Sequence, residues 1–211
     1  MRSVHSLFYF GLLSTLLVFA GCEEDEEAAP PAEVETVLIE DLETGTRRRG
    51  RDTTYFDLES GQIVPDDQAN TTEWDIAFDN TDILVNSGIS GSGQVEAQIV
   101  EGVFESIGSA PENGYRTDAD SALAIPAGPE FENSWYRYTA ETRPARAVLP
   151  IPGRVIVLRT NEGNFAKLEI ISWYKGNPDT STDEFADNIP ARGSGHFTFQ
   201  YALRPGGSRE F

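Results

Sequence analysis

Apolar and polar residues alternate with a period of two along several stretches of this chain. EWDIAF (73–78) places its aromatic and branched residues on one face and its acids on the other. DILVNSG (82–88) and GQVEAQIV (93–100) follow with similar alternation, and GHFTFQYAL (195–203) repeats it near the end. Because side chains of a β-strand point alternately to opposite faces, each stretch predicts a half-buried strand.

The longest β-signal is RVIVLRTNEGNFAKLEIISWY, residues 154–174. Two runs rich in branched and aromatic residues flank the turn-forming tetrapeptide Asn161-Glu162-Gly163-Asn164. This arrangement predicts a β-hairpin, with Gly163 at a positive φ that glycine adopts without steric cost.

Proline and glycine interrupt the rest of the chain, notably in IPAGPEFENS (125–134) and LPIPG (149–153). Short strands and frequent turns are typical of two packed antiparallel sheets, so we expect a mainly β sandwich or barrel-like fold. Helical periodicity is scarce. One or two short helices are expected at most, near Asp118–Leu123 or Asp183–Asn188.

The N-terminal segment carries an export signal. An apolar run from Leu7 to Phe19 is too short to span a membrane, and it leads into Phe19-Ala20-Gly21-Cys22, which resembles a bacterial lipobox. We expect residues 1–21 to be a lipoprotein signal peptide and Cys22, the only cysteine, to be lipidated. A plain secretory signal is the alternative.

Five acidic residues follow Cys22 directly, and alanine and proline come after them. This composition buries too little surface to fold, so 22–51 is predicted to be a tether and 52–211 a single β domain. An acidic run after a lipidated cysteine resembles a signal for display on the outer membrane. The prediction is therefore a lipid-anchored protein of the outer membrane that faces the cell exterior.

The charge of the chain limits its partners. The formal net charge is −19, which repels phosphates and makes nucleic acid a poor partner. The basic cluster at 47–51 is interpreted as a loop that neutralises its acidic surroundings. Lys167 and Lys175 are the only lysines, and the large excess of acids favours a salty habitat in which self-repulsion is screened.

No motif indicates catalysis. The Gly-rich segment 86–93 lacks the lysine and the following helix of a phosphate loop, so it is interpreted as a turn between strands. DTSTDEFAD (179–187) lacks the glycine and the terminal glutamate of a calcium loop, so a solvated loop is favoured. His196 is the only histidine outside the signal, and no G-x-S-x-G motif occurs. We therefore expect a binding protein and no enzyme.

The segment EWDIAFDNTDILVNSGISGSG (73–93) resembles the characteristic region of the HmuY-like haem-binding lipoproteins. SWYRY (134–138), the 154–174 stretch and HFTFQYAL (196–203) fit the same family in order. The resemblance implies an all-β fold of two packed sheets, display at the outer membrane, and capture of haem or porphyrin for delivery to an outer-membrane transporter.

In that family, two histidines or two methionines hold the haem iron, from loops that correspond to residues 115–150 here. This chain has neither residue type there, and only Tyr115, Tyr136 and Tyr138 remain as possible phenolate ligands. The alternative for each tyrosine is ordinary packing within a strand.

Arg143 and Arg146 are the predicted partners of the haem propionates. The alternative function is a HmuY-type surface module that has lost haem and binds another ligand or a protein partner.

Overall fold

The computed structural model describes residues 34–44 and 53–211, which form three antiparallel sheets joined by short connections and one long loop. The strands are β1 (Thr36–Glu43), β2 (Thr54–Asp57), β3 (Gln62–Val64), β4 (Ile76–Asp79), β5 (Asp82–Val85), β6 (Glu96–Glu101), β7 (Tyr136–Tyr138), β8 (Val148–Pro150), β9 (Arg154–Arg159), β10 (Phe165–Tyr174) and β11 (Ser194–Arg204). The helices are α1 (Asp183–Asp187) and the 3-10 turns η1 (Asp66–Gln68), η2 (Phe104–Ser106), η3 (Ile189–Ala191) and η4 (Pro205–Gly207).

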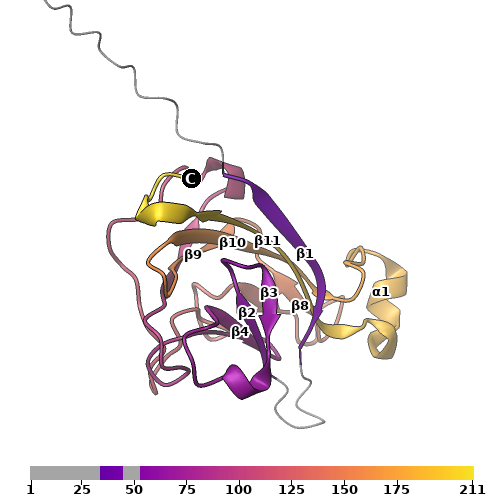
Figure 1. Cartoon of the computed structure of the whole chain (residues 1–211). Coiled ribbons are helices and arrows are strands. Elements are labelled where there is room, and N and C mark those ends of the chain that lie inside the picture. Colours follow the sequence, from indigo (N-terminus) through magenta and orange to yellow (C-terminus); the bar gives the residue numbers. More distant parts are fainter. Residues whose placement is uncertain (1–33, 45–52) are drawn as a thin grey trace, which may run out of the picture. The chain divides into compact units, whose positions relative to one another are not determined.

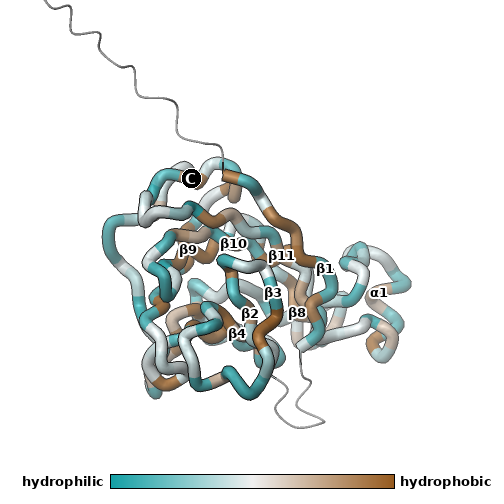
Figure 2. Tube along the Cα trace, viewed as in Figure 1, coloured by the Kyte–Doolittle hydropathy of each residue, from teal (hydrophilic) through white to brown (hydrophobic). Residues whose placement is uncertain are grey.

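The two larger sheets pack against each other. One has the order β1-β11-β10-β9-β6 and the other β3-β2-β4-β5, while β7 and β8 form a separate pair. In Figure 1, β2 and β4 lie beneath the layer made by β9, β10 and β11. Figure 2 shows hydrophobic residues along β1 and β3 and mainly hydrophilic residues in the connecting loops. The mainly β architecture expected from the sequence is confirmed.

Aromatic rings fill the space between these two sheets. Phe56 meets Phe199 with ring centroids 5.6 Å apart, and Phe78 meets Phe197 at 4.6 Å. All four side chains are buried. Burying a ring of this size stabilises the folded state by about 1.5–3 kcal/mol relative to exposure, so this layer joins the sheets.

The large sheet is also covered on its other face. Val155 and Val157 of β9 pack with Phe104 there, while the alternate residues of β9 face the core between the sheets. The buried Lys167 donates from Nζ to the carbonyls of Phe104 and Ile107, both at 2.9 Å. Burial on both faces explains why β9 is an unbroken apolar run.

The strongest strand predictions are confirmed. β9 and β10 form the expected hairpin, with Gly163 at a φ of +83°, and β11 covers the predicted closing strand. The Gly-rich segment connects β5 to β6 as a turn, and α1 occupies one of the two expected helical positions.

Three expectations differ from the structure. β1 lies inside the predicted tether and pairs with β11, so the folded part begins before the predicted boundary at residue 52. Residues 118–123 are not helical, because Ala119 and Ala122 pair with each other in a tight turn. The EWDIAF strand is buried on both faces, since Asp75 and Ala77 are as inaccessible as their apolar neighbours.

Several predictions fall outside the described residues. These are the signal peptide 1–21, the lipidation site Cys22, the tether segments 22–33 and 45–51, and with the latter the whole basic cluster at 47–51. Among the helices that the structure describes, none has the length and apolar character needed to cross a membrane.

Candidate functional site

A pocket of about 290 Å³ opens beside the Gly-rich connection between β5 and β6. Its other walls come from the long loop between β6 and β7. The lining side chains that define its chemistry are Ile89, Arg116, Asp120, Leu123, Phe131 and Asn133.

The pocket combines an apolar surface with one cation. Ile89 and Phe131 are 57% and 40% exposed, although apolar side chains of this size are usually buried. Arg116 contributes a guanidinium, and Asp120 is the acidic lining residue. Such a site suits an apolar ligand with a carboxylate, because guanidinium binds carboxylate with paired hydrogen bonds.

Local pairing holds the rim of the pocket. Arg116 and Ala97 of β6 exchange two main-chain hydrogen bonds of 2.9 Å, which ties the loop to the edge of the large sheet. Ala119 and Ala122 exchange two more, of 3.0 and 3.1 Å. The guanidinium of Arg116 therefore projects from an anchored stretch of backbone.

The lining contains no ordinary iron ligand. None of the side chains that line this pocket is a histidine, methionine, cysteine or tyrosine. His196 lies on β11 opposite Glu43 of β1, where its Nδ1 is 3.1 Å from the Gly193 carbonyl oxygen. For haem, the apolar wall suits the porphyrin ring and Arg116 suits a propionate. The lining side chains, however, offer no usual ligand for the haem iron.

Tyr115 precedes Arg116 but belongs to the apolar cluster on the outer face of the large sheet. Its ring packs against Phe165 with centroids 6.1 Å apart. Burial raises the pKa of the Tyr115 hydroxyl to about 12, against the opposing effect of Gln98 beside it. The raised pKa means that this hydroxyl is harder to ionise than an ordinary tyrosine, which disfavours a phenolate ligand.

Tyr136 and Tyr138 lie on β7, away from the cluster that contains Tyr115. Tyr136 is buried against Trp135, with ring centroids 4.6 Å apart, and belongs to the core between the sheets. Tyr138 is 42% exposed on the same strand. The three predicted tyrosines therefore do not converge on one site.

The predicted propionate partners occupy the loop between β7 and β8. Arg143 forms exposed ion pairs with Asp183 and Asp187 of α1, with N–O distances of 2.6 and 2.7 Å. Arg146 is exposed in the same loop, at a φ of +55°. Neither arginine lines the pocket that contains Arg116.

Sequence reasoning misses Ile89, Arg116 and Phe131. Ile89 stands among the glycines of a predicted turn, and Phe131 stands in a proline-rich loop. An isolated apolar residue between glycines or prolines is only a weak sign of a binding site. The sequence offers no stronger one, because these positions do not follow the repeat of a strand or a helix.

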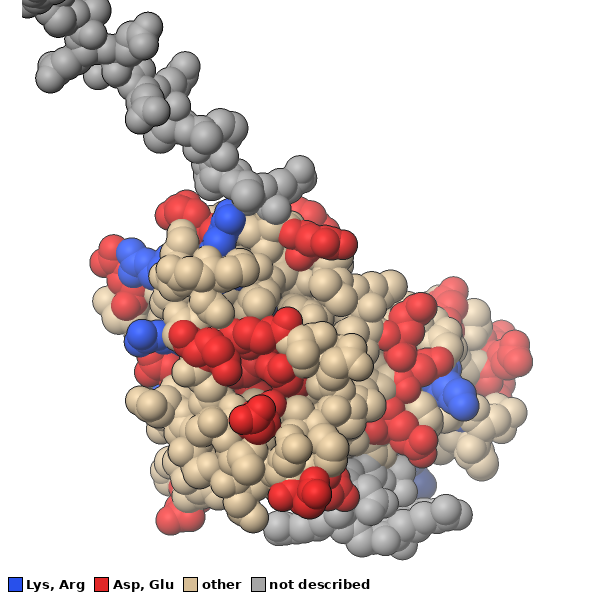
Figure 3. Space-filling view, in the orientation of Figure 1, with Lys and Arg blue, Asp and Glu red and all other residues tan. Residues whose placement is uncertain are grey.

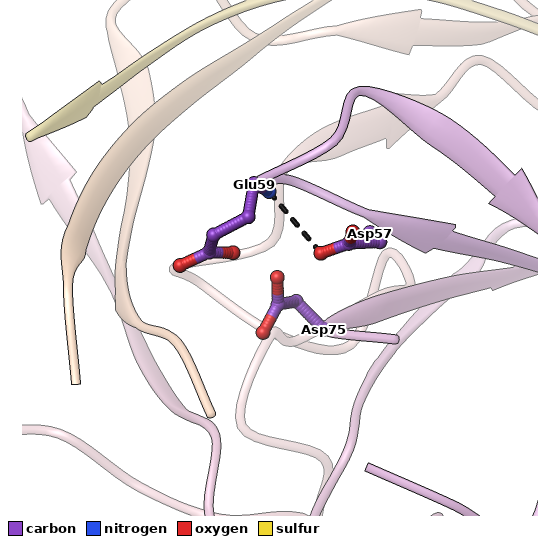
Figure 4. Close-up of side chains that lie close together, drawn as sticks. All are labelled: Asp57, Glu59 and Asp75. Carbon is purple, nitrogen blue, oxygen red and sulfur yellow. Dashed lines mark hydrogen bonds between the residues drawn. The ribbon is translucent and has the colours of Figure 1, made fainter. Parts of the chain in front are cut away.

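A cluster of acids lies on another part of the molecule, where the β2–β3 turn and the start of β4 meet the turn between β9 and β10. Figure 4 shows the carboxyl groups of Asp57, Glu59 and Asp75 turned toward one another, and one oxygen of each lies within 4.8 Å of the other two. Figure 3 shows acidic side chains gathered on this side of the molecule.

The protein itself supplies donors to most of these carboxyl oxygens. Asp75 accepts the amides of Leu58 and Asn161, both at 3.1 Å. Glu59 Oε1 accepts Thr160 Oγ1 at 2.6 Å and Asn164 Nδ2 at 3.1 Å. Among the described residues, no N–H or hydroxyl donor is found for the buried Glu59 Oε2, so a hydrogen bond between Glu59 and Asp75 requires a protonated carboxyl group.

The position of Asp75 changes its acidity. Burial, a hydrogen bond with Glu59 and the charge of Glu59 raise the pKa of Asp75 to about 8, against the two main-chain amides that lower it. The pKa of Glu162, on the adjoining turn, is raised by burial and by the charge of Glu59. Asp75 therefore favours its protonated form at neutral pH. The three carboxyl groups lie close enough to hold a cation, but protein donors already occupy both oxygens of Asp57 and Asp75 and Oε1 of Glu59.

A family model describing the HmuY protein matches residues 50–201, which is most of the chain. The chain belongs to the HmuY family. The match includes both the pocket and the acidic cluster.

Several solved structures of bacterial proteins are similar to this chain. An apo HmuY analogue of Tannerella forsythia, TFO, is 16% identical, with 82% of this chain and 96% of that chain covered and a TM-score of 0.49. Apo PinO of Porphyromonas gingivitis is 15% identical, with coverages of 81% and 97% and a TM-score of 0.49. A proposed HmuY-like haem-binding protein of Bacteroides vulgatus is 15% identical, with coverages of 80% and 90% and a TM-score of 0.45. No curated protein matches significantly.

The segment that resembles the HmuY family forms a polar network in this structure. Asn86 is fully buried, donates to the carbonyls of Thr71 and Trp74 at 2.9 and 2.7 Å, and accepts the amide of Gly93 at 2.9 Å. Asn161 donates to the same Trp74 carbonyl at 2.7 Å. These residues join the four-stranded sheet to the turn between β9 and β10, so their role is to hold the HmuY fold together.

Proposed function

We propose that this protein is a lipid-anchored surface protein that captures haem or a related porphyrin for uptake. In this proposal, the apolar surface of Ile89 and Phe131 receives the macrocycle, Arg116 binds one carboxylate, and the iron has no protein ligand. The observation that carries the proposal is the pocket of a HmuY-family protein with an apolar wall and a guanidinium but no iron-binding side chain.

The size of the pocket agrees with a carrier that releases its ligand. At about 290 Å³ it is near the lower limit of about 300–1,000 Å³ for sites that enclose drug-sized ligands. A porphyrin would therefore be covered along one edge and exposed along the other. An exposed edge leaves room for an outer-membrane transporter to take the ligand.

A second candidate function rests on the exposure of Ile89 and Phe131. Exposed apolar side chains that lie together also mark sites where another protein docks. On this alternative, the HmuY fold has lost haem and the pocket accepts an apolar side chain of a protein partner or another small ligand.

A titration with haemin and with metal-free protoporphyrin distinguishes these functions. We expect saturable binding of both, with dissociation constants within about threefold of each other, because an iron bond would add far more than the roughly 0.65 kcal/mol that threefold represents. A six-coordinate, low-spin ferric spectrum would contradict the absence of protein ligands. Failure of both compounds to bind below about 10 μM, which is roughly 7 kcal/mol, would leave the second function.

Arg116→Gln tests the guanidinium. We expect it to weaken porphyrin binding by about tenfold, since a charge-assisted hydrogen bond contributes about 1.5–3 kcal/mol and the mouth of the pocket is open to water. The matched control is Arg143→Gln, which removes an exposed arginine outside the pocket. Equal weakening by both variants would indicate general attraction to positive charge.

The proposed anchor is tested separately at Cys22. Radiolabelled palmitate should enter the full-length chain in a bacterial host and be absent from Cys22→Ser, because no other cysteine exists. The wild type should partition with membranes, since more than one acyl chain gives stable anchoring. Equal labelling of both proteins would exclude lipidation at this position.

A further inference from the structure

The pocket walls meet at one buried carboxylate. Asp118 is 1% exposed, although it lies between the lining residues Arg116 and Asp120. Its Oδ1 accepts the amide of Ala124 at 2.8 Å, and its Oδ2 accepts the amide of Val85 at 3.0 Å. The two oxygens thus connect the long loop to the end of β5.

The backbone of Asp118 fixes the opposite wall. Its carbonyl oxygen accepts the amide of Ile89 at 3.2 Å, which holds the residue that carries the exposed apolar side chain. Gly88 makes this approach possible, because its φ is +60° and a Cβ there would lie 1.8 Å from the same carbonyl oxygen. The Gly-rich segment therefore brings Ile89 to the pocket.

We propose that Asp118 is a positioning residue that holds the Ile89 wall and the 119–124 loop at the separation that the ligand requires. The inference rests on the proposed function, since it assigns a task to the same pocket. Asp118 does not touch the ligand in this proposal. It acts through Ile89 and through the loop that ends at Ala124.

The chemistry of the site distinguishes Asp118 from asparagine. Both carboxylate oxygens accept main-chain N–H groups, whereas the amide nitrogen of asparagine is a donor and would face one of those N–H groups. Asp118→Asn therefore keeps the shape and size of the side chain but releases either Val85 or Ala124. One wall of the pocket should then move without any change at its surface.

The test compares Asp118→Asn with Asp75→Asn. Asp75 is a matched control, because it is also 1% exposed and also accepts two main-chain amides, but it lies in the acidic cluster. We expect Asp118→Asn to weaken protoporphyrin binding by about tenfold and Asp75→Asn by less than about twofold. Equal weakening by both variants would overturn the inference.

Native-state hydrogen exchange of the ligand-free wild type tests the same inference without a variant. The amides of Val85, Ile89 and Ala124 should open together, with one common free energy, because one residue holds all three. Independent opening of these amides would overturn the positioning role even if porphyrin binds.

A failure of the proposed function can be distinguished from a failure of the inference about Asp118. If the wild type binds no porphyrin while the three amides still open together, the proposed function fails and Asp118 remains the residue that organises the pocket. If Asp118→Asn does not fold, hydrogen exchange of the wild type alone tests the positioning role. Addition of protoporphyrin to the wild type should then slow these three amides and leave those of Leu58 and Asn161 unchanged.

Discussion

Asp75 and Asp118 are two buried carboxyl groups with the same local contacts and different surroundings. Each is 1% exposed, and each accepts main-chain amides from two separate segments. Asp75 has Glu59 and Asp57 beside it. Asp118 instead lies beneath the rim of an open pocket, with Gly88 packed against its backbone.

A buried carboxyl group that accepts two main-chain amides therefore has different effects at the two positions. Around Asp75, acidic neighbours make ionisation costly, so the cluster joins the two sheets best when it holds a proton. Around Asp118, the same pair of amide bonds fixes the spacing of two walls and leaves the pocket open. We therefore expect variants of Asp75 to change the pH dependence of stability and variants of Asp118 to change ligand binding.

The largest expected effect comes from removing each carboxyl group. Asp118→Ala leaves the amides of Val85 and Ala124 without acceptors, at about 1–3 kcal/mol each, so the free energy of unfolding should fall by roughly 2–6 kcal/mol. Asp75→Ala likewise leaves the amides of Leu58 and Asn161 without acceptors. It also removes a carboxyl group that is costly to ionise, so its loss at pH 9 should be smaller than its loss at pH 5.

Urea unfolding at the two pH values measures this contrast. Asp75→Ala should lose less stability at pH 9 than at pH 5, because burial and Glu59 raise the pKa of Asp75. If Asp75→Ala costs the same at both values, the acidic neighbours of Asp75 have no energetic effect and the comparison fails.

A second prediction concerns Glu59→Gln and the pH dependence of stability. The pKa of Asp75 is about 8 in the folded protein, against an ordinary value of 3.8 once the chain unfolds, so the folded state binds more protons between these values. The contribution of Asp75 is therefore fully present below pH 3.8 and is lost as pH rises toward 8, by at most about 1.4 kcal/mol per pH unit.

Glu59→Gln should flatten this decline. The glutamine oxygen can keep the bonds from Thr160 and Asn164. Its Nε2 takes the place of Oε2, for which the protein supplies no N–H or hydroxyl donor, and can donate to ionised Asp75. Urea midpoints from pH 4 to pH 9 measure the effect. The exposed Glu141→Gln is the control, and a parallel decline in both variants and the wild type would exclude the Asp75–Glu59 pair as its source.

The parts of the fold that the sequence predicts are those with strong alternation. The 154–174 hairpin and β11 carry long runs of branched and aromatic residues on either side of clear turn residues. β1 is not predicted, because its sequence TVLIEDLE follows the acidic segment after Cys22 and has only three apolar residues before its acids. Its stability comes from pairing with β11, which is far away in sequence.

The pocket could not be predicted for a related reason. Asp118 before an alanine-containing stretch suggests the start of a helix, because aspartate often accepts the amides of a first helical turn. Its carboxylate instead accepts one amide from outside the loop, that of Val85. A local pattern contains no information on such a distant contact, so the loop and its lining residues become visible only in the fold.

The smallest expected effect is that of salt, which should act on the stability of the fold and on the contribution of Arg116 to binding. The net charge of −19 makes the folded protein repel itself, and the range of this repulsion falls from about 10 Å at 0.1 M salt to about 3 Å at 1 M. Sodium chloride should therefore raise the thermal midpoint across this interval. The same screening should reduce the difference in protoporphyrin affinity between the wild type and Arg116→Gln, because that difference comes from the charge of Arg116, whereas the net charge acts on both proteins almost alike.

Glu59→Gln provides a second test of the salt effect. This variant has one acid fewer in the acidic cluster, so its thermal midpoint should rise less with sodium chloride. A midpoint that does not respond to chloride would refute the self-repulsion argument. If the difference in protoporphyrin affinity between the wild type and Arg116→Gln does not shrink with salt, the charge of Arg116 does not bind the carboxylate.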